Sequence, residues 1–238
     1  MGTTARNSAL YLNGFNLSGY FRSFDVTDDC GLEDTTVWGA SVVGKSWTPT
    51  LMESKMAYGG FWDPTLVTGP NAAVRAAIAL ATTPVLCHWP IGDAVGNPGF
   101  AMAARVANRK VSGSVDGVLS LEMELQSNVG DEDVISLHST SAAETLDGNG
   151  TTVDNGAATT SGGAIYLQSN LVATNNIVTV RHSTDNFVGS DVLLGTFATV
   201  SADYKAERIA ISGTINRYVR CVWNLTGDAT FQVAIHRR

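Results

Sequence analysis

The chain has 238 residues, which is enough for one large domain or two modest ones. Only 16% of the residues are charged, and this composition, with 24 glycines, favours tightly turned strands over long solvated helices. The formal charge of −7 argues against tight nucleic-acid binding, which normally needs a cluster of Lys and Arg on one face.

The sequence lacks the roughly 18 consecutive apolar residues that span a bilayer, and residues 1–13 lack the charged-then-apolar plan of a signal peptide. We therefore expect a protein that is made and kept in the cytosol. The three cysteines are odd in number and far apart, so they fit neither a disulfide framework nor a metal site. We expect small buried apolar residues at all three positions, which are Cys30, Cys87 and Cys221.

The first predicted elements are two strands within residues 9–26, around an Asn13-Gly14 pair that favours a tight hairpin turn. A Gly-rich stretch interrupted by Pro49 then predicts a loop, which leads into a strand over residues 55–62. The alanines that follow Pro70 predict a helix over residues 70–80, because Pro suits the first turn and Ala is the best helix former.

Residues 84–90 predict a further strand, and residues 100–115 and 117–127 predict a long strand pair. The last of these alternates apolar with polar residues, which is typical of an antiparallel strand with one solvated face. Its apolar positions are Leu119, Leu121, Met123 and Leu125.

Residues 144–163 hold no aromatic residue and little that could be buried, so they predict a linker or a mobile surface loop. This linker separates a first domain of residues 1–143 from a second domain of residues 164–238. Short strand candidates at the spacing of a sandwich follow, within residues 164–170, 176–183, 192–200, 208–215, 217–225 and 230–238. Two apolar stripes can close a small core there, one of Val219, Cys221, Trp223 and Leu225, the other of Phe231, Val233 and Ile235.

The run GASVVGKS at residues 39–46 matches the pattern of a phosphate-binding loop. Such a loop needs a helix directly after it, so that amide groups and the helix dipole converge on phosphate. Here Pro49 would lie inside that helix, and the alternating strand–helix units of a nucleotide-binding sheet are missing. We interpret the run as a Gly-rich turn, which leaves a nucleotide-dependent enzyme supported by Lys45 and Ser46 alone.

Neither the acidic residues nor the histidines form a recognisable site. The acidic group matches neither an EF-hand nor a fixed carboxylate pair, and we interpret it as solvated loop charge or turn capping: Asp25, Asp28, Asp29, Glu33 and Asp34. The histidines make no metal-binding spacing: they are His88, His138, His182 and His236. Since no nucleophile elbow or Cys–His spacing occurs either, the sequence predicts no catalytic residue, no metal and no cofactor.

The runs GLEDTTVWG, KSWTPTL and MESKMAYGGFWDP, all within residues 31–64, resemble the tail tube proteins of long-tailed bacteriophages. Residues 116–130 look like the strand that closes the same domain. The resemblance implies a mainly β fold: a tail-tube-type β-sandwich or split barrel with one flanking α-helix, in six copies per ring, with rings stacked into a hollow tube. Residues 164–238 look like the small β-sandwich domain that many such proteins carry on the outside of the tube.

The function implied by this resemblance is that of a virion structural protein, without enzymatic activity, that is assembled in the host cytoplasm into a siphophage-type tail. Its partners would be further copies of itself, the tape-measure protein, other tail proteins, and phage DNA that passes through the lumen without specific binding. No membrane is involved, and acidic lumen walls would repel the phosphates of DNA. The alternative is a capsid decoration protein or minor tail protein whose C-terminal sandwich binds carbohydrate or the host surface.

The predicted contact between subunits or between rings lies in residues 31–62. Large aromatics in so Gly-rich a segment favour a protein interface, and the candidates are Trp38, Trp47, Pro49 and Trp62. The alternative that these tryptophans pack into the core of their own subunit stays open.

Overall fold

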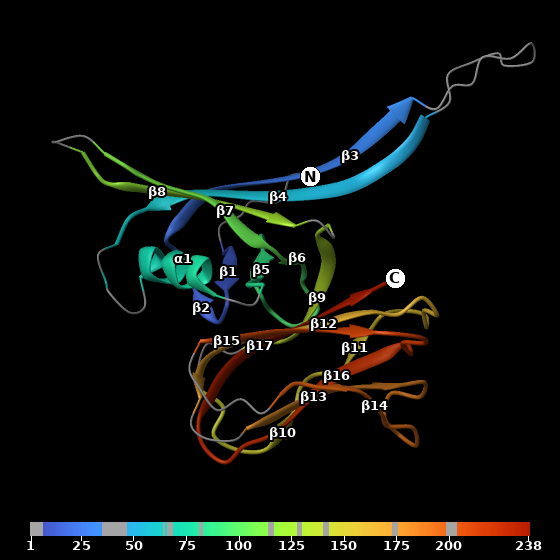
Figure 1. Cartoon of the computed structure of the whole chain (residues 1–238). Helices are drawn as coiled ribbons and strands as arrows, with labels where there is room; N and C mark the ends of the chain where they lie inside the picture. Colours follow the sequence, from blue (N-terminus) through green and yellow to red (C-terminus); the bar gives the residue numbers. More distant parts are fainter. Residues whose placement is uncertain are drawn as a thin grey trace, which may run out of the picture.

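The structure of the chain, a computed structural model, describes residues 7–34, 47–63, 65, 69–80, 83–113, 117–127, 130–139, 143–172, 176–198 and 204–238. Within these ranges the molecule is mainly β, as the sequence predicts, with 17 strands and one helix. The strands form three antiparallel sheets that lie one above another (Figure 1). Within the same ranges no helix is long and apolar enough to cross a membrane.

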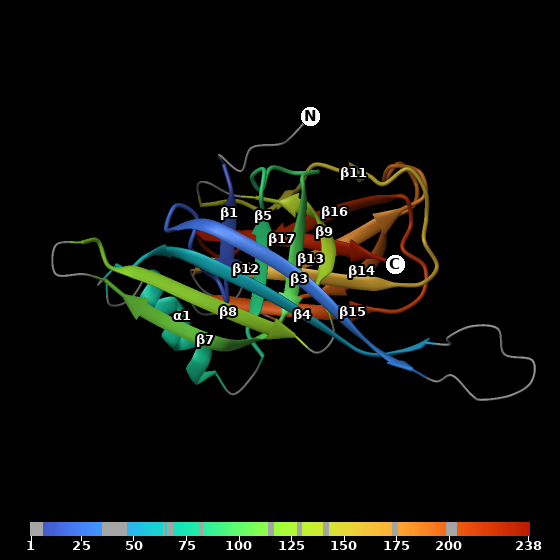
Figure 2. The same cartoon turned by 90° about the horizontal axis from the view of Figure 1, so that it is seen from above.

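A four-stranded sheet covers one end of the molecule. Its strands are, in spatial order, β3 (Phe21–Asp34), β4 (Trp47–Phe61), β8 (Ser120–Ser127) and β7 (Arg105–Ser112). Strands β3 and β4 are long, and their paired ends at Asp34 and Trp47 extend beyond the body of the molecule (Figures 1 and 2). The predicted loop before residue 55 is therefore wrong in its second part, because Trp47 already pairs with Asp34.

An eight-stranded sheet forms the middle layer. Its strands are, in spatial order, β15 (Lys205–Ile211), β12 (Gly163–Val172), β17 (Ala229–Arg237), β9 (Glu132–His138), β6 (Pro98–Ala103), β5 (Val85–Trp89), β1 (Ala9–Leu12) and β2 (Phe15–Asn16). Strands from both halves of the chain meet in it, through the pairing of Ile135 on β9 with Ile235 on β17. The domain boundary predicted at residue 143 therefore does not separate two sheets.

A five-stranded sheet forms the other end. It contains β10 (Gly148–Asn149), β16 (Tyr218–Asn224), β13 (Ile177–Ser183) and β14 (Val192–Thr196), with β11 (Val153–Asp154) also paired to β16. Residues 144–163, for which the sequence predicts a linker, thus supply two strands of this sheet. Short polar residues suffice there because the pairing uses backbone groups, as where the Gly150 N–H donates to the Cys221 carbonyl at 2.8 Å.

Three groups of buried side chains hold the layers together. The first, around Trp223 and Phe231, lies between the five-stranded and eight-stranded sheets and includes the two apolar stripes predicted from the sequence. The third includes Tyr11 and Tyr166, from opposite ends of the eight-stranded sheet, so this sheet curls around its own side chains. The second lies between the eight-stranded and four-stranded sheets, and its members include Met56, Leu86, Leu121, Met123 and Leu125.

Local signals place the elements that flank the second group. The Asn13-Gly14 turn joins β1 to β2 with φ angles of 50° and 85°, as predicted. The helix α1 (Pro70–Ala79) begins at the predicted proline and packs Ala73, Val74 and Ala77 against this group. The strand predicted over residues 100–115 is divided at Ala104 into β6 and β7, which belong to different sheets.

The cysteines follow the prediction at two of three positions. Cys87 and Cys221 are buried, and burial raises the pKa of the Cys87 thiol to about 12, so this thiol is unreactive at neutral pH. Cys30 is exposed on β3, and the prediction of burial is wrong there. The reason is that β3 lies at the edge of its sheet and beyond the reach of the core.

Candidate assembly surface

The four-stranded sheet has one apolar and one polar face, because successive side chains of a strand point to opposite sides. On β8 the buried residues alternate with Glu122, Glu124 and Gln126, which point away from the core. On β4 the outward positions opposite Glu124 and Glu122 are small, Ala57 and Gly59, whereas Lys55 lies opposite Gln126. The outward face of this sheet is therefore polar, and the small side chains at its centre leave a shallow depression there.

A shallow trough of about 330 Å³ crosses this outward face at the small residues. Carboxylates from two strands line it, Asp25 from β3 and Glu122 and Glu124 from β8. Only Glu122 among them has an ion-pair partner within the described residues, Lys110 at 3.3 Å. The trough is accordingly an acidic surface.

Both edges of the four-stranded sheet are unpaired in the part of the chain that the structure describes. β3 pairs only with β4, and β7 pairs only with β8. β3 is exposed at nearly every described position, which is unusual for a strand of 14 residues. An exposed edge of this length offers a row of free N–H and C=O groups to another strand.

The two edges carry opposite charge. On β3 the outward side chains include Asp25 and Asp29, and neither makes an ion pair within the described residues. On β7 the positions that the pairing places on the outward face include Arg105 and Lys110, and the strand contains no acidic residue. The Arg105 guanidinium also donates a hydrogen bond to the Leu80 carbonyl at the end of α1, at 3.0 Å. A positive edge of one copy would therefore attract the negative edge of another.

The charges on the two edges are also equally spaced. Asp25 and Asp29 are four positions apart on β3. Arg105 and Lys110 are five apart in sequence, but an irregularity between Val106 and Asn108 removes one position from the pairing. They consequently lie opposite Gln126 and Glu122 of β8, which are four positions apart.

The residues predicted as an inter-subunit contact lie apart from these edges or outside the described residues. Trp38 belongs to residues that the structure does not describe, and so does the phosphate-loop pattern of residues 39–46. The backbones of Trp47 and Pro49 pair with β3, but their side chains are not described. Trp62 is half-buried against the core group of its own chain that contains α1. The contact role of these four residues stays a prediction.

The interpretation of the acidic residues of β3 as loop charge is wrong, because β3 continues through them as a strand. Asp28 points inward, where the buried Ser54 hydroxyl donates a hydrogen bond to it. The same hydroxyl accepts a hydrogen bond from the Asp131 N–H at 3.0 Å. Burial, together with the hydrogen bond and charge of Asp28, raises the pKa of Asp131 to about 6. No sequence signal links these aspartates, which are about 100 residues apart.

Among the histidines, His88 lies in the most polar buried surroundings. Its ring nitrogens contact the Ser8 hydroxyl at 2.8 Å and the Tyr58 hydroxyl at 3.3 Å. Burial lowers the pKa of His88 to about 4, so the ring is neutral at pH 7. The described residues contain no group of three or more His, Cys, Asp or Glu side chains that could hold a metal ion.

No protein-family model matches the sequence, and no curated protein is similar to it. Among solved structures, the virion of a native gene transfer agent particle contains a chain that is 10% identical, with a TM-score of 0.43, covering 53% of this chain and 94% of its own. A chain in the tail of an empty gene transfer agent particle, determined with C6 symmetry, is 12% identical with a TM-score of 0.38, covering 53% and 93%.

A third similar structure is the Dit protein of phage SPP1, described as a paradigm of the hub adsorption apparatus in phages that infect Gram-positive bacteria. It is 12% identical with a TM-score of 0.36, and the match covers 97% of this chain and 99% of that one. These identities and TM-scores are too low for the likeness to indicate a function. The feature that bears on function is the arrangement of edges and charges on the four-stranded sheet.

Proposed function

We propose that this chain is a structural protein of a phage-type tail, which forms hexameric rings that stack into the tail tube and has no catalytic role. The observation that carries the proposal is the pair of oppositely charged edges on the four-stranded sheet, with which no other described strand pairs. Two different edges that bind each other make a head-to-tail contact, and such contacts close into rings when the rotation permits.

The strand directions suit such a ring. An antiparallel sheet of four strands has edges that run in opposite directions, so β3 and β7 are antiparallel to each other. In a ring, every copy has the same orientation about the axis. Hence β3 of one copy meets β7 of the next in antiparallel sense, and the alternation of directions continues without a break around the ring.

The charges fix the register of this contact. Antiparallel pairing that places Asp25 opposite Lys110 also places Asp29 opposite Arg105, because both pairs are four positions apart. Within one copy, by contrast, the strand pairing connects Lys110 to Ser23: Lys110 pairs with Glu122, Glu122 with Gly59, and Gly59 with Ser23. Lys110 would therefore face Asp25 of the next copy, two residues along β3 from Ser23. Each contact shifts the strand register by two residues, and a sheet needs such a shear to close on itself.

Ring size decides whether a channel remains. Closed sheets of 8 strands are filled by their own side chains, whereas those of 16–18 strands leave an open channel. Six copies of the four-stranded sheet give 24 strands, with a backbone diameter of about 37 Å at the usual strand spacing. Such a ring is wide enough for duplex DNA.

The polar face would line this channel, because the apolar face is covered by α1 and the eight-stranded sheet. Its carboxylates would repel DNA phosphates and let the duplex pass without specific binding. The five-stranded sheet lies at the far end of the molecule from this face, so it would be on the outside of the tube (Figure 1). The tape-measure protein and other tail proteins complete the proposed set of partners. The proposed location of the protein is the tail of the phage virion.

Disulfide trapping tests the ring and its register together. In the proposed contact Thr27 of one copy faces Asn108 of the next, midway between the two charge pairs, with Cβ atoms about 5 Å apart. The double variant Thr27→Cys, Asn108→Cys, made in a Cys30→Ser background, should give an oxidised ladder that ends at six subunits. Negative-stain images of the unmodified chain at high concentration should show rings or tubes.

A matched pair displaced along the strand serves as the control. Ser23→Cys with Asn108→Cys moves one thiol by four residues, about 13 Å, which is beyond disulfide reach. If both pairs gave the same ladder, the register would be wrong. If neither formed covalent oligomers and the concentrated chain stayed monomeric, the ring itself would be refuted.

A further inference from the structure

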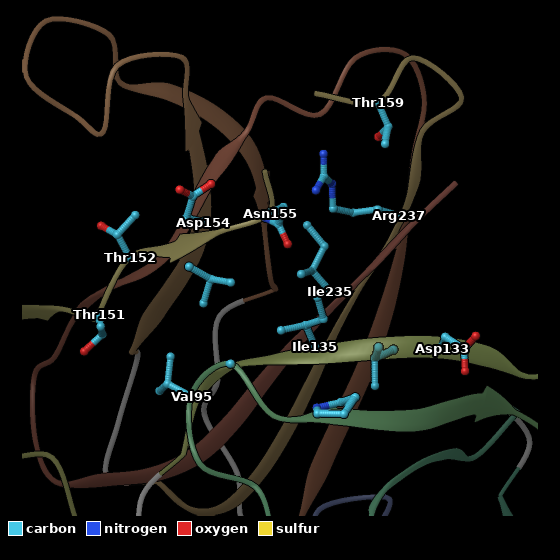
Figure 3. A pocket seen from close by; sticks show the side chains of 14 residues that line it. Val95, Asp133, Ile135, Thr151, Thr152, Asp154, Asn155, Thr159, Ile235 and Arg237 are labelled. Carbon is cyan, nitrogen blue, oxygen red and sulfur yellow. The ribbon is translucent and has the colours of Figure 1, made fainter. Parts of the chain in front are cut away.

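A second surface, distant from the four-stranded sheet, has the features of a binding site. An open groove of about 1010 Å³ lies where the five-stranded sheet meets the eight-stranded sheet (Figure 3). Its floor is apolar and comes from the eight-stranded sheet and the loop after β5, through Val95, Ile135 and Ile235. One wall is residues 151–155, which contain the short strand β11.

β11 presents an unused backbone edge to this groove. On its inner side Val153 pairs with Val219 of β16, and the Asn155 N–H donates to the Arg217 carbonyl at 3.0 Å. On its outer side no strand is paired with it in the described part of the chain. Because N–H and C=O groups alternate in direction along a strand, those of Thr152 and Asp154 point away from β16 and are available to an added strand.

Three buried polar atoms that have no hydrogen-bond partner among the described residues gather at one end of the groove. They are the Asn155 side-chain oxygen, the Thr159 hydroxyl oxygen and Arg237 Nε (Figure 3). Together they offer an acceptor, a hydroxyl and a donor. A buried polar atom left unpaired costs about 1–3 kcal/mol, so this end of the groove is a polar and poorly compensated part of the surface.

The charge at this end of the groove is uncompensated. Arg237 donates to two carbonyl oxygens, of Ala157 and Ile215, and forms no ion pair within the described residues. Burial lowers the pKa of this guanidinium, as expected where a cation has lost water without gaining an anion. Asp154, the nearest carboxylate in sequence to Asn155, is already held by Nε and Nη2 of Arg217, each at 2.6 Å.

From the free edge, the apolar floor and the uncompensated cation we infer that this groove binds an extended peptide segment of a partner protein. The peptide adds a strand to β11, places an apolar side chain on Val95 and Ile135, and presents a carboxylate to Arg237. Carbohydrate fits less well, because the residues that line the groove include no aromatic ring for a sugar to stack on.

This inference does not depend on ring formation and is tested separately, with a random heptapeptide display library selected on the full chain. We expect enrichment of peptides that combine an acidic residue with apolar residues at alternate positions. The synthesised peptide should bind at least about tenfold more weakly to Arg237→Gln and to Val95→Glu. Val188→Glu is the control, since Val188 is 88% exposed in a loop that does not line the groove.

Two further measurements keep the test decisive. Thermal unfolding of each variant shows whether it is folded, and Arg237→Gln, which adds no charge to the apolar floor, decides the matter if Val95→Glu unfolds. The inference is overturned if no peptide is enriched, or if enriched peptides bind the wild-type and Arg237→Gln chains equally. It is also overturned if a glycan array, and not the peptide library, gives binding that these two substitutions abolish.

Discussion

Glu132 on β9 accepts hydrogen bonds from two nitrogens of the Arg208 guanidinium on β15, from Nη2 at 2.7 Å and from Nε at 3.1 Å. Tyr166 on β12 donates its hydroxyl to the same carboxylate, and Arg238 approaches it at 3.1 Å. Glu132 itself is only 7% exposed. One buried carboxylate therefore ties β9, from the first half of the chain, to β12, β15 and the C-terminal residue.

We predict that Glu132→Gln lowers the free energy of unfolding by about 2 kcal/mol, because it leaves Arg208 and Tyr166 without the anion that they surround. Burial alone would raise the pKa of Glu132, but hydrogen bonds from Arg208 and Tyr166 outweigh it and lower the pKa. The charged form is therefore the stable one. Thermal unfolding should show a midpoint about 4–8 °C lower. Asp228→Asn, at an exposed position, should change the midpoint little, and equal effects would argue against the role of Glu132.

We predict that acid destabilises the fold in part through His138. This residue is 5% exposed, its ring packs on Trp223 and Phe231, and burial lowers its pKa from 6.5 to about 4. Between these values the unfolded chain binds a proton at this side chain and the folded chain does not. Stability therefore falls as the pH falls from 6.5 to 4, by up to about 3 kcal/mol.

The variant His138→Phe isolates this effect. It removes the titrating group and a buried nitrogen, Nε2, which lies 3.7 Å from the Glu144 carboxylate and makes no hydrogen bond within the described residues, so stability at pH 7 should be unchanged or higher. Asp131, whose raised pKa of about 6 acts in the opposite direction, is present in both proteins and cancels in the difference. Denaturant unfolding between about pH 4 and 7 should show a smaller change of stability with pH for the variant. An identical change would mean that His138 does not titrate as its burial implies.

Those parts of the fold that have a local cause could be predicted from sequence. The Asn13-Gly14 turn, the start of α1 at Pro70 and the alternation of β8 each follow from neighbouring residues. The pairing of β9 with β17, in contrast, joins residues about 100 positions apart and has no local signature.

The candidate assembly surface could not be predicted, for a related reason. β3 is exposed on both faces along much of its length, so it lacks the apolar alternation by which a strand is recognised. Its aspartates consequently resemble loop charge. The equal spacing of charges on β3 and β7 depends on an irregularity between Val106 and Asn108, which the pairing reveals and the sequence does not.

Gly14 allows the eight-stranded sheet to curl. Its φ angle is 85°, and a Cβ atom there would lie 2.3 Å from the Ser169 carbonyl oxygen of β12, across the curl. We predict that Gly14→Ala costs about 2–4 kcal/mol, from backbone strain together with this overlap. Gly213→Ala is the matched control, with a φ of 83° and open space around the added atom, and should cost about 1 kcal/mol. Equal losses in chemical denaturation would show that the overlap is relieved without cost.

Reversing the charge of one edge should prevent ring formation. Asp25→Lys with Asp29→Lys makes both edges positive, and Arg105→Glu with Lys110→Glu makes both edges negative. Like charges that face each other across a strand pair are destabilising, so each variant alone should remain monomeric in light scattering. The second variant loses the exposed Lys110–Glu122 pair and the hydrogen bond from Arg105 to the Leu80 carbonyl, each worth about 1 kcal/mol, so both variants should fold.

Mixing the two variants should restore rings, because every positive edge then meets a negative one. Copies must alternate around such a ring, which requires an even number of subunits, as in a hexamer. Mass photometry of the equimolar mixture should show one species of about six subunits, and raising the salt concentration should weaken it as the charges are screened. Rings of a single variant would show that the edges do not meet. A mixture that stays monomeric while the wild type assembles would show that these four charges do not face one another.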